Sequence, residues 1–431
     1  MRDTLINNFL RISSIPRSSG NEKQISDFFV EIAKNNNLDY YQDENYNLII
    51  KKKGNIEGDS IAFQVHLDMV CKKRENSNHD FNTDGIDVII NGDEVTAKDT
   101  SLGADQGVGL AIMLTLMEEK SIKHPDLEFL FTVEEETTFK GVITFPYDRV
   151  ESKKMINLDY SIDNAVVVAS AGDIVNEYTY EGQLSKKEMK SYKITLDGLL
   201  GGNSGDYIDR SRDNAITLLV SKLIDKEVYL KSINGGTFEN DVAVSCEIVL
   251  QTNDVLFNEL GNSNYKIEQI QNDESFSLED TKNIFNQILD LKSGRITENS
   301  SGNLGLIRTT DNKVMIKYLY RSTKEEDLEN FSNSESIFNV NMLYDDHIWK
   351  IKDNSFMLKK YKEVYYKLFN EYPIEVIGQG GMEITSFQKA IDGMDIISIG
   401  ANMTNIHTVD EITYISSWEK IYNIVINMIK D

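Results

Sequence analysis

Cysteine is nearly absent from this chain of 431 residues, which contains only Cys71 and Cys246. Two cysteines are too few for a disulfide framework or for a cluster of metal-binding thiolates. Any metal ion in this protein must therefore be held by histidine and carboxylate side chains.

Long apolar runs are also absent. No segment approaches the roughly 18 apolar residues that a membrane-spanning helix needs. The opening MRDTLINNFLRISSIPRSSG lacks the basic start and the apolar core of a secretory signal. We therefore expect a cytoplasmic protein that does not enter a membrane.

Basic residues are scarce relative to acidic ones. The chain has 45 Lys and Arg against 70 Asp and Glu, which gives a formal net charge of -25. Surfaces that bind nucleic acid or anionic membranes need clustered Lys and Arg, so this charge argues against both kinds of partner. We interpret the acidity as a source of solubility.

Strand-like and helix-like patterns alternate in the first part of the chain. Apolar residues at helical spacing predict helices at 3–13, at 21–35 and from residue 105. Predicted strands lie at 46–54, 60–70, 127–136, 153–161 and 164–172, with a hairpin at 86–97. This alternation is typical of an α/β sheet with helices on both faces.

The pattern changes near residue 185. From there to residue 351 the strands become amphipathic and helical segments lie between them, which predicts a separate α+β domain. Residues 352–431 return to the first style. We therefore predict one α/β domain formed by 1–184 and 352–431, interrupted by an inserted domain at 185–351.

One apolar stretch ends in three adjacent carboxylates. The predicted strand LEFLFTV is followed directly by Glu134, Glu135 and Glu136. Adjacent anions repel one another, which argues against a structural role unless a positive group lies among them. The three carboxylates therefore need a positive partner.

Other polar residues lie at predicted strand ends or helix starts. His66 ends a predicted strand, and Asp68 lies two positions later on the same face, where it could orient the imidazole ring. Taken alone, His66 is equally well explained as a surface histidine. Asp105 is explained equally simply as a helix N-cap.

Two further residues complete the set. Asp159 ends the predicted strand MINLD, and His407 lies in the loop GANMTNIHTVDE. Each alone is an ordinary loop residue. Together with His66, Asp105 and one of the adjacent glutamates, however, they all fall where binding sites of open α/β sheets assemble.

This set, in this order, resembles the co-catalytic zinc metallopeptidases that include aminoacylase, carboxypeptidase G and bacterial dipeptidases. The segments TSLGADQGVGLAIML, HPDLEFLFTVEEE and MINLDYS are most similar to the aminoacyl-histidine dipeptidases, which are carnosinase-like Xaa-His dipeptidases. The resemblance runs from IPRSSGNE to IHTVDE. It implies a catalytic α/β domain with a mixed sheet, an inserted α+β lid or dimerisation domain, and a homodimer.

The resemblance also implies roles for individual residues. It gives two metal ions five ligands, which are His66 and Asp159 for one ion, Glu136 and His407 for the other, and Asp105 as the bridge. Asp68 becomes the partner of His66, and Glu135 the general base that moves a proton from water to the leaving amine. His and carboxylate ligands suit Zn²⁺, with Mn²⁺ or Co²⁺ as alternatives.

Some positions depart from the family pattern. In DGLLGGNSGDYID the relatives have a histidine that stabilises the tetrahedral intermediate, whereas this chain has Asn203, an uncharged donor. In GQGGMEITSF, Gln379 likewise replaces a histidine. The resemblance implies substrate binding by Arg321, Asn303 and Glu383. Arg321 could hold a substrate carboxylate bidentately, although an exposed arginine at a strand end is a comparable explanation.

The leading hypothesis is a dinuclear metallopeptidase that cleaves dipeptides or short peptides. An amidohydrolase of the same architecture, which removes the acyl group of N-acyl amino acids, is an alternative. A metal-binding relative with weak or no catalysis also stays open because of Asn203 and Gln379. Glu135 argues against the last, since a structural metal needs no base. A dinucleotide site at Gly107 and Gly109 is excluded, because Ile112 stands where the third small residue should be.

Overall fold

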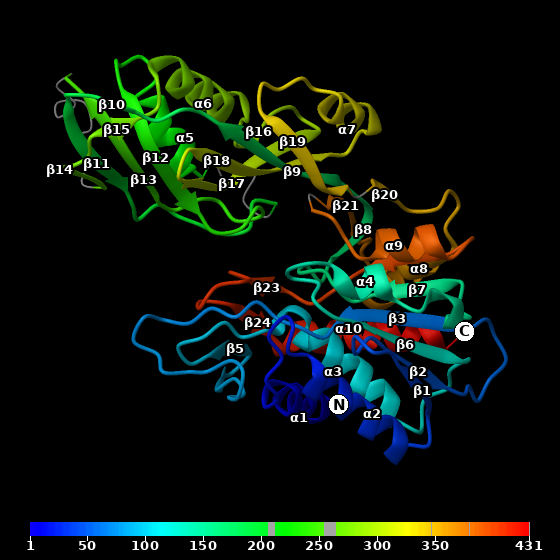
Figure 1. Ribbon diagram of the computed structural model, residues 1–431. Coiled ribbons are helices and arrows are strands. Elements are labelled where there is room, and N and C mark those ends of the chain that lie inside the picture. The colour runs from blue at the N-terminus through cyan, green and yellow to red at the C-terminus, as the bar shows by residue number, and fades with distance from the viewer. Residues whose placement is uncertain (206–211, 254–263, 346, 379, 431) are drawn as a thin grey trace. The chain divides into compact units, whose positions relative to one another are not determined.

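The computed structural model describes residues 1–205, 212–253, 264–345, 347–378 and 380–430. Within these residues the chain folds as two compact units. The first contains Met1–Ala169, Trp349–Gly378 and the segment from Met382 onward, and the second contains Ser170–Ile348 with Gly380 and Gly381. The second unit is thus inserted in the sequence of the first (Figure 1).

The chain passes from the first unit to the second after residue 169 and returns to the first after residue 348. The sequence pattern instead predicts these boundaries at 184/185 and 351/352. The first difference arises from strand β9 (Gly172–Glu181). It pairs with β18 (Lys313–Ser322) and β19 (Asn339–Asp345) of the second unit. Its pattern alone does not indicate this pairing, because the partner strands lie far away along the chain.

A nine-stranded mixed sheet forms the centre of the first unit (Figure 1). From edge to edge its strands are β1 (Asp39–Gln42), β2 (Leu48–Lys52), β6 (Leu127–Thr132), β3 (Ile61–His66), β7 (Lys154–Asn157), β22 (Asp395–Ser398), β8 (Ala165–Ser170) and β20 (Trp349–Lys350), with β21 (Ile374–Gly378) paired to β8. The central strands β6, β3, β7 and β22 are parallel, and β2 and β8 flank them antiparallel. The predicted α/β class with a mixed sheet is confirmed.

Helices cover both faces of this sheet. On β3, Phe63 and Val65 belong to one apolar core and Ala62 to another, as the alternation of side chains along a strand requires. The first core includes residues of α1 (Arg2–Ser13), α2 (Lys23–Asn35), α3 (Ala104–Glu118), α8 (Phe356–Phe369) and α10 (Ile415–Ile429). The second includes residues of α4 (Lys140–Thr144), a 3-10 turn (Tyr147–Arg149) and α9 (Ile384–Ala390).

Helix α3 is buried on almost all sides. Leu110, Ala111 and Ile112 are consecutive, so they point in three directions around the helix axis, yet all three are buried. A helix of this kind must be enclosed by other elements. It packs against α1, α2, α10 and β3, and this packing fixes its first turn, which carries Asp105.

A second, four-stranded sheet of the first unit contains β4 (Val88–Asn91), β5 (Glu94–Ala97), β24 (Ile412–Tyr414) and β23 (Met403–Thr404). The hairpin predicted at 86–97 is confirmed, since β4 and β5 pair antiparallel around Gly92, which has a φ of 66°. His407 lies in the loop between β23 and β24.

The second unit is built on a nine-stranded sheet. From edge to edge its strands are β14 (Tyr265–Ile270), β11 (Lys190–Leu196), β13 (Cys246–Thr252), β12 (Tyr229–Gly236), β17 (Ser300–Thr310), β18, β9 and β19, with β16 (Gly294–Arg295) paired to β17, while β10 (Ser185–Lys186) pairs with β15 (Glu274–Ser275). Helices α5 (Ala215–Ser221), α6 (Leu278–Asp290) and α7 (Glu325–Ser332) complete its described part. This is the α+β arrangement that the sequence predicts for the inserted segment.

Candidate metal centre

The candidate site forms where three parallel strands of the first unit end. Strand β3 lies between β6 and β7, with His66 opposite Thr132 at the ends of β3 and β6. Glu135 and Asp159 follow β6 and β7 within a few residues. Because parallel strands end at the same edge of a sheet, their terminal residues are brought together there.

Asp105 lies between the two histidines. Its Oδ1 is 3.3 Å from His66 Nε2, and its Oδ2 is 3.5 Å from His407 Nε2. His407 Nε2 is also 3.0 Å from Glu136 Oε1, and His66 Nε2 is 3.9 Å from Asp159 Oδ1. The five side chains therefore form two groups that share Asp105.

The pair formed by Glu136 and His407 fits a bound cation better than a direct hydrogen bond. Glu136 Oε1 and His407 Nε2 are buried and 3.0 Å apart, yet neither has a hydrogen-bond partner among the described residues. Two donors at about 2.0–2.2 Å from one tetrahedral Zn²⁺ lie roughly 3.3 Å apart, close to this spacing. Donor atoms of His66, Asp105 and Glu136 also lie within 4.8 Å of one another.

Negative charge accumulates at this edge of the sheet. Burial and the charge of Asp105 raise the pKa of Asp159 to about 7. Burial raises the pKa of Glu135 well above its usual value, and the charge of Glu136 adds to this against the opposing effect of His66. A divalent cation would compensate these charges and favour the ionised carboxylates.

The turn after β6 explains the three adjacent glutamates. Glu134 has a left-handed backbone with a φ of 51°, which turns the chain at the end of the strand. The backbone N–H groups of Glu135 and Glu136 donate to Oδ1 and Oδ2 of Asp68, at 3.1 and 3.2 Å. Asp68 Oδ1 also lies 3.4 Å from Nδ1 of His66. One buried carboxylate thus contacts both the imidazole and the turn.

Known proteins share this whole architecture. No protein-family model matches the chain. The cytosol non-specific dipeptidase of Escherichia coli (strain K12) is 28% identical over 478 aligned residues, which cover 98% of this chain and 96% of that protein. The crystal structure of aminoacylhistidine dipeptidase from Vibrio alginolyticus is 26% identical, with a TM-score of 0.72 over 99% of this chain and 96% of that one. Over nearly its full length, this chain is similar to these dipeptidases.

The predicted resemblance to the aminoacyl-histidine dipeptidases is thereby confirmed. A tripeptidase structure from Staphylococcus aureus is 18% identical and shares the fold, with a TM-score of 0.67 over 100% of this chain and 98% of that one.

In the described parts of the chain, no helix combines the length and the apolar character needed to cross a membrane.

Glu383 occupies the position for which the resemblance to the dipeptidases implies substrate binding. It is buried just before α9, and its Oε2 accepts hydrogen bonds from Gln64 and Thr132, both at 2.6 Å. Burial raises its pKa to about 8. These contacts attach the segment before α9 to β3 and β6 near the ends that carry the candidate site.

The other residues to which the resemblance gives a role are Asn203, Asn303 and Arg321. They lie in the second unit, close to one another. Asn303 donates to the backbone oxygen of Asp241, and Asn203 pairs with Asp241 through a β-bridge. Arg321 donates to Oγ of Ser204, the residue after Asn203, at 2.7 Å. Three residues far apart in sequence therefore meet in one region. Gln379 lies outside the described residues.

Arg321 is not the exposed strand-end arginine that the sequence leaves open. It is 6% exposed, and its Nε lies 3.3 Å from Asp173 Oδ1. Asp173 also accepts a hydrogen bond from the backbone of Gly381. A buried guanidinium needs such a counter-charge, since an unpaired buried charge is costly.

The sequence pattern does not single out four polar residues that lie around the candidate metal centre. Gln106 donates to Asp159 Oδ1 at 2.7 Å, and Glu22 accepts from the backbone of Glu134 at 3.0 Å. Arg17 and Glu411 contact the segment that precedes Asp105. All four lie inside the motifs IPRSSGNE, ADQG and IHTVDE, but only the folded structure reveals that they are buried.

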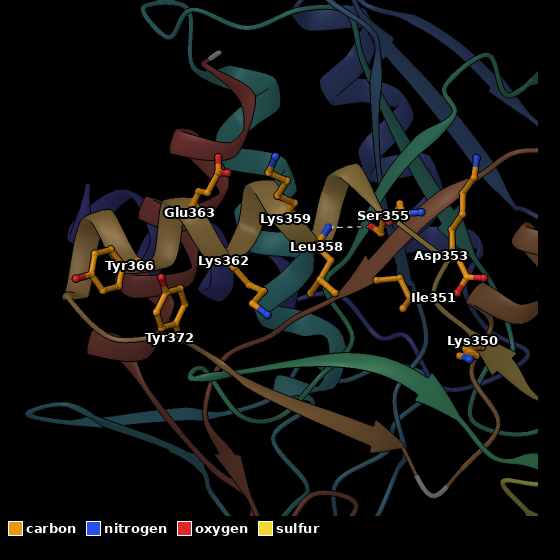
Figure 2. A pocket seen from close by; sticks show the side chains of 12 residues that line it. Lys350, Ile351, Asp353, Ser355, Leu358, Lys359, Lys362, Glu363, Tyr366 and Tyr372 are labelled. Atoms are coloured by element: carbon orange, nitrogen blue, oxygen red, sulfur yellow. Dashed lines mark hydrogen bonds between the residues drawn. The ribbon is translucent and has the colours of Figure 1, made fainter.

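A cavity of about 570 Å³ lies elsewhere in the first unit (Figure 2). Its lining residues come from 350–372 and include Lys350, Lys359 and Lys362 with the stacked rings of Tyr366 and Tyr372. It contains none of the candidate metal ligands. Lysine side chains do not suit a cation, so this cavity is unrelated to the metal centre.

Proposed function

We propose that this chain is a dinuclear metal-dependent dipeptidase that hydrolyses the peptide bond of dipeptides or short peptides. The observation that carries the proposal is the position of Asp105, whose two carboxylate oxygens face His66 and His407 separately. In this proposal His66 and Asp159 would hold one metal ion, Glu136 and His407 would hold a second, and Asp105 would be shared by both. The homology to dipeptidases supports the substrate class.

The chemistry divides between the ions and the protein. The donor set suits Zn²⁺, with Mn²⁺ or Co²⁺ as alternatives. When bound, such a pair of ions would polarise the scissile carbonyl and make a water molecule more acidic. Glu135 lies one residue from Glu136 in the turn that Asp68 holds. There it takes the proton of the attacking water and returns it to the leaving amine.

A dipeptide panel tests the proposal. Protein loaded with Zn²⁺, Mn²⁺ or Co²⁺ should hydrolyse at least one dipeptide, including Xaa-His and β-alanyl-His candidates, and chelation followed by metal addition should abolish and restore the rate. Metal-free protein with full activity would contradict the proposal. Hydrolysis confined to N-acyl amino acids would favour the amidohydrolase, and two bound metals without any hydrolysis would favour a non-catalytic homologue.

Arg321 is proposed to hold the carboxylate of the substrate. In Arg321→Lys the charge beside Asp173 remains, but the planar fork that recognises a carboxylate is lost. We expect kcat/KM for the best dipeptide to fall about 10- to 100-fold, the effect of losing a hydrogen bond to a charged group. Steady-state kinetics with a free and a C-terminally amidated dipeptide measure this.

The amidated dipeptide is the control for Arg321. It lacks the carboxylate, so Arg321→Lys should leave its kcat/KM unchanged. An equal loss for both substrates would show that Arg321 acts only through the stability of the second unit. Arg321→Ala is a poorer test, because removal of one partner leaves Asp173 buried and unpaired.

We further propose a cytoplasmic homodimer formed through the second unit. Strand β19 is an edge of its sheet and exposes Val340, Met342 and Leu343. An exposed apolar edge strand is a template for pairing with another chain. Light scattering should therefore give twice the mass of one chain, and Met342→Lys should shift the protein toward the monomer. A wild-type monomer at micromolar concentration would contradict this assembly.

A further inference from the structure

The segment that carries Asp105 is held by one buried carboxylate, Glu411. Its Oε2 accepts hydrogen bonds from the backbone of Leu102 at 2.8 Å and of Gly103 at 3.0 Å. Its Oε1 accepts from Ala104 at 2.8 Å, and lies 3.4 Å from the backbone nitrogen of Asp105. Four consecutive N–H groups therefore point at a single side chain, which is 3% exposed.

This arrangement is a nest of backbone donors at a helix start. Gly103 has a φ of 68°, which lets neighbouring N–H groups turn toward one point. The N-terminus of α3 adds the positive end of its dipole. Glu411 also lies four residues after His407, so the loop that carries one candidate ligand anchors the segment that carries another.

Arg17 holds the same segment from its carbonyl side. Its guanidinium donates to the backbone oxygen of Gly103 and, through the other nitrogen, to those of Leu67 and Asp68. Leu67 directly follows His66. Arg17 is 3% exposed and thus ties the end of β3 to the segment that precedes Asp105.

We infer that Arg17 and Glu411 are a positioning pair that holds Asp105 between His66 and His407. Glu411 joins the segment 102–105 to the His407 loop, and Arg17 joins it to the end of β3. The distances from Asp105 to both histidines are thereby set by the protein before any metal binds. This inference rests on the proposed dinuclear function and extends it to two residues that do not touch the ions.

The test compares two buried glutamates with the same kind of contacts. Glu128 is also 3% exposed and accepts hydrogen bonds from the backbone of Glu151 at 3.1 Å and of Ser152 at 2.7 Å. It lies near the start of β6, at the opposite end of that strand from the candidate site. Each variant weakens bonds from backbone N–H groups to a buried carboxylate, and Glu128→Gln also loses an ion pair of 3.0 Å with Nζ of Lys51. Only Glu411→Gln disturbs the segment of Asp105.

Metal affinity separates positioning from mere stability. We expect both variants to unfold at lower temperature, because each loses charge-assisted hydrogen bonds. Only Glu411→Gln should weaken Zn²⁺ binding, measured by competition with a chromophoric chelator, by about 10- to 100-fold, the usual effect of changing a residue that supports a ligand. Its kcat should fall while KM changes little.

Three results decide the matter. Wild-type Zn²⁺ affinity and kcat in Glu411→Gln would overturn the inference, as would an equal loss in Glu128→Gln. Failure of the wild-type protein to bind two ions would instead overturn the proposed function.

If Glu411→Gln does not fold, Arg17→Lys carries the same test, since one ammonium cannot replace the guanidinium at three carbonyls. If both single variants fold, their combined effect on affinity should be smaller than the sum, because both act on one segment.

Discussion

Glu135→Gln should lower kcat for the best dipeptide about 10²- to 10⁴-fold, the range that general acid–base catalysis contributes. Glutamine has the size of glutamate but cannot accept the proton of the attacking water. The backbone N–H of residue 135 would still donate to Asp68, so the turn should keep its shape. Both metal ions should therefore remain bound, which elemental analysis of the purified variant measures alongside kcat.

Glu134→Gln is the matched control. The two glutamates are neighbours, but Glu134 Oε1 lies 3.4 Å from Nζ of Lys140, and its Oε2 accepts a hydrogen bond from Thr138 at 2.8 Å. This side chain is engaged with the surface of the turn, and its loss should change kcat less than threefold. The role of Glu135 would be refuted if both variants lost activity equally, or if Glu135→Gln stayed as active as the wild type.

The residues at the strand ends could be predicted because the relevant information is local. An apolar run predicts β3 and β6, and the polar residue that ends each run is visible without knowledge of the fold. His66 ends the first run, and Glu135 belongs to the three glutamates that end the second. The parallel pairing of the central strands then brings these ends to one edge, which the alternation of strands and helices also predicts.

The backbone of the site could not be predicted in the same way. The sequence offers Asp105 as a helix N-cap, yet the N-cap of α3 is Gly103 and makes no side-chain cap bond. Asp105 has a φ of -80° and a ψ of 111°, which is not helical. The N–H groups at the helix start are satisfied by Glu411, which leaves the carboxylate of Asp105 free for the two histidines.

Buried charged residues whose partners lie far away along the chain could not be predicted from the sequence either. Glu411 and Asp105 are 306 positions apart, and Arg17 and Leu67 are 50 apart. Charged residues are mostly exposed, so the sequence favours a surface position for each of them. The same prior made an exposed Arg321 plausible, and the structure shows it buried beside Asp173. Burial of a charge is decided by tertiary contacts, which a one-dimensional pattern does not contain.

Asp105→Asn is expected to have the largest effect on the metal centre. Its two oxygens face His66 and His407, so an amide would place a neutral oxygen on one side and a donor NH₂ group on the other. The NH₂ group cannot bind a cation, and one negative charge is lost. The metal content should fall from two ions per chain to one or none, as elemental analysis measures. The activity should fall at least about 10³-fold, since metal ions contribute several kcal/mol of charge stabilisation.

The same substitution at Asp395 distinguishes loss of a ligand from loss of a buried aspartate. Asp395 is 7% exposed at the start of β22 and accepts hydrogen bonds from Oγ of Ser355 and from the backbone of Met357. Asp395→Asn should lower the free energy of unfolding, yet keep two ions per chain. If Asp105→Asn also kept both ions and its activity, Asp105 would not be the bridge. The two histidines would then have to belong to separate sites, each completed by its own carboxylates.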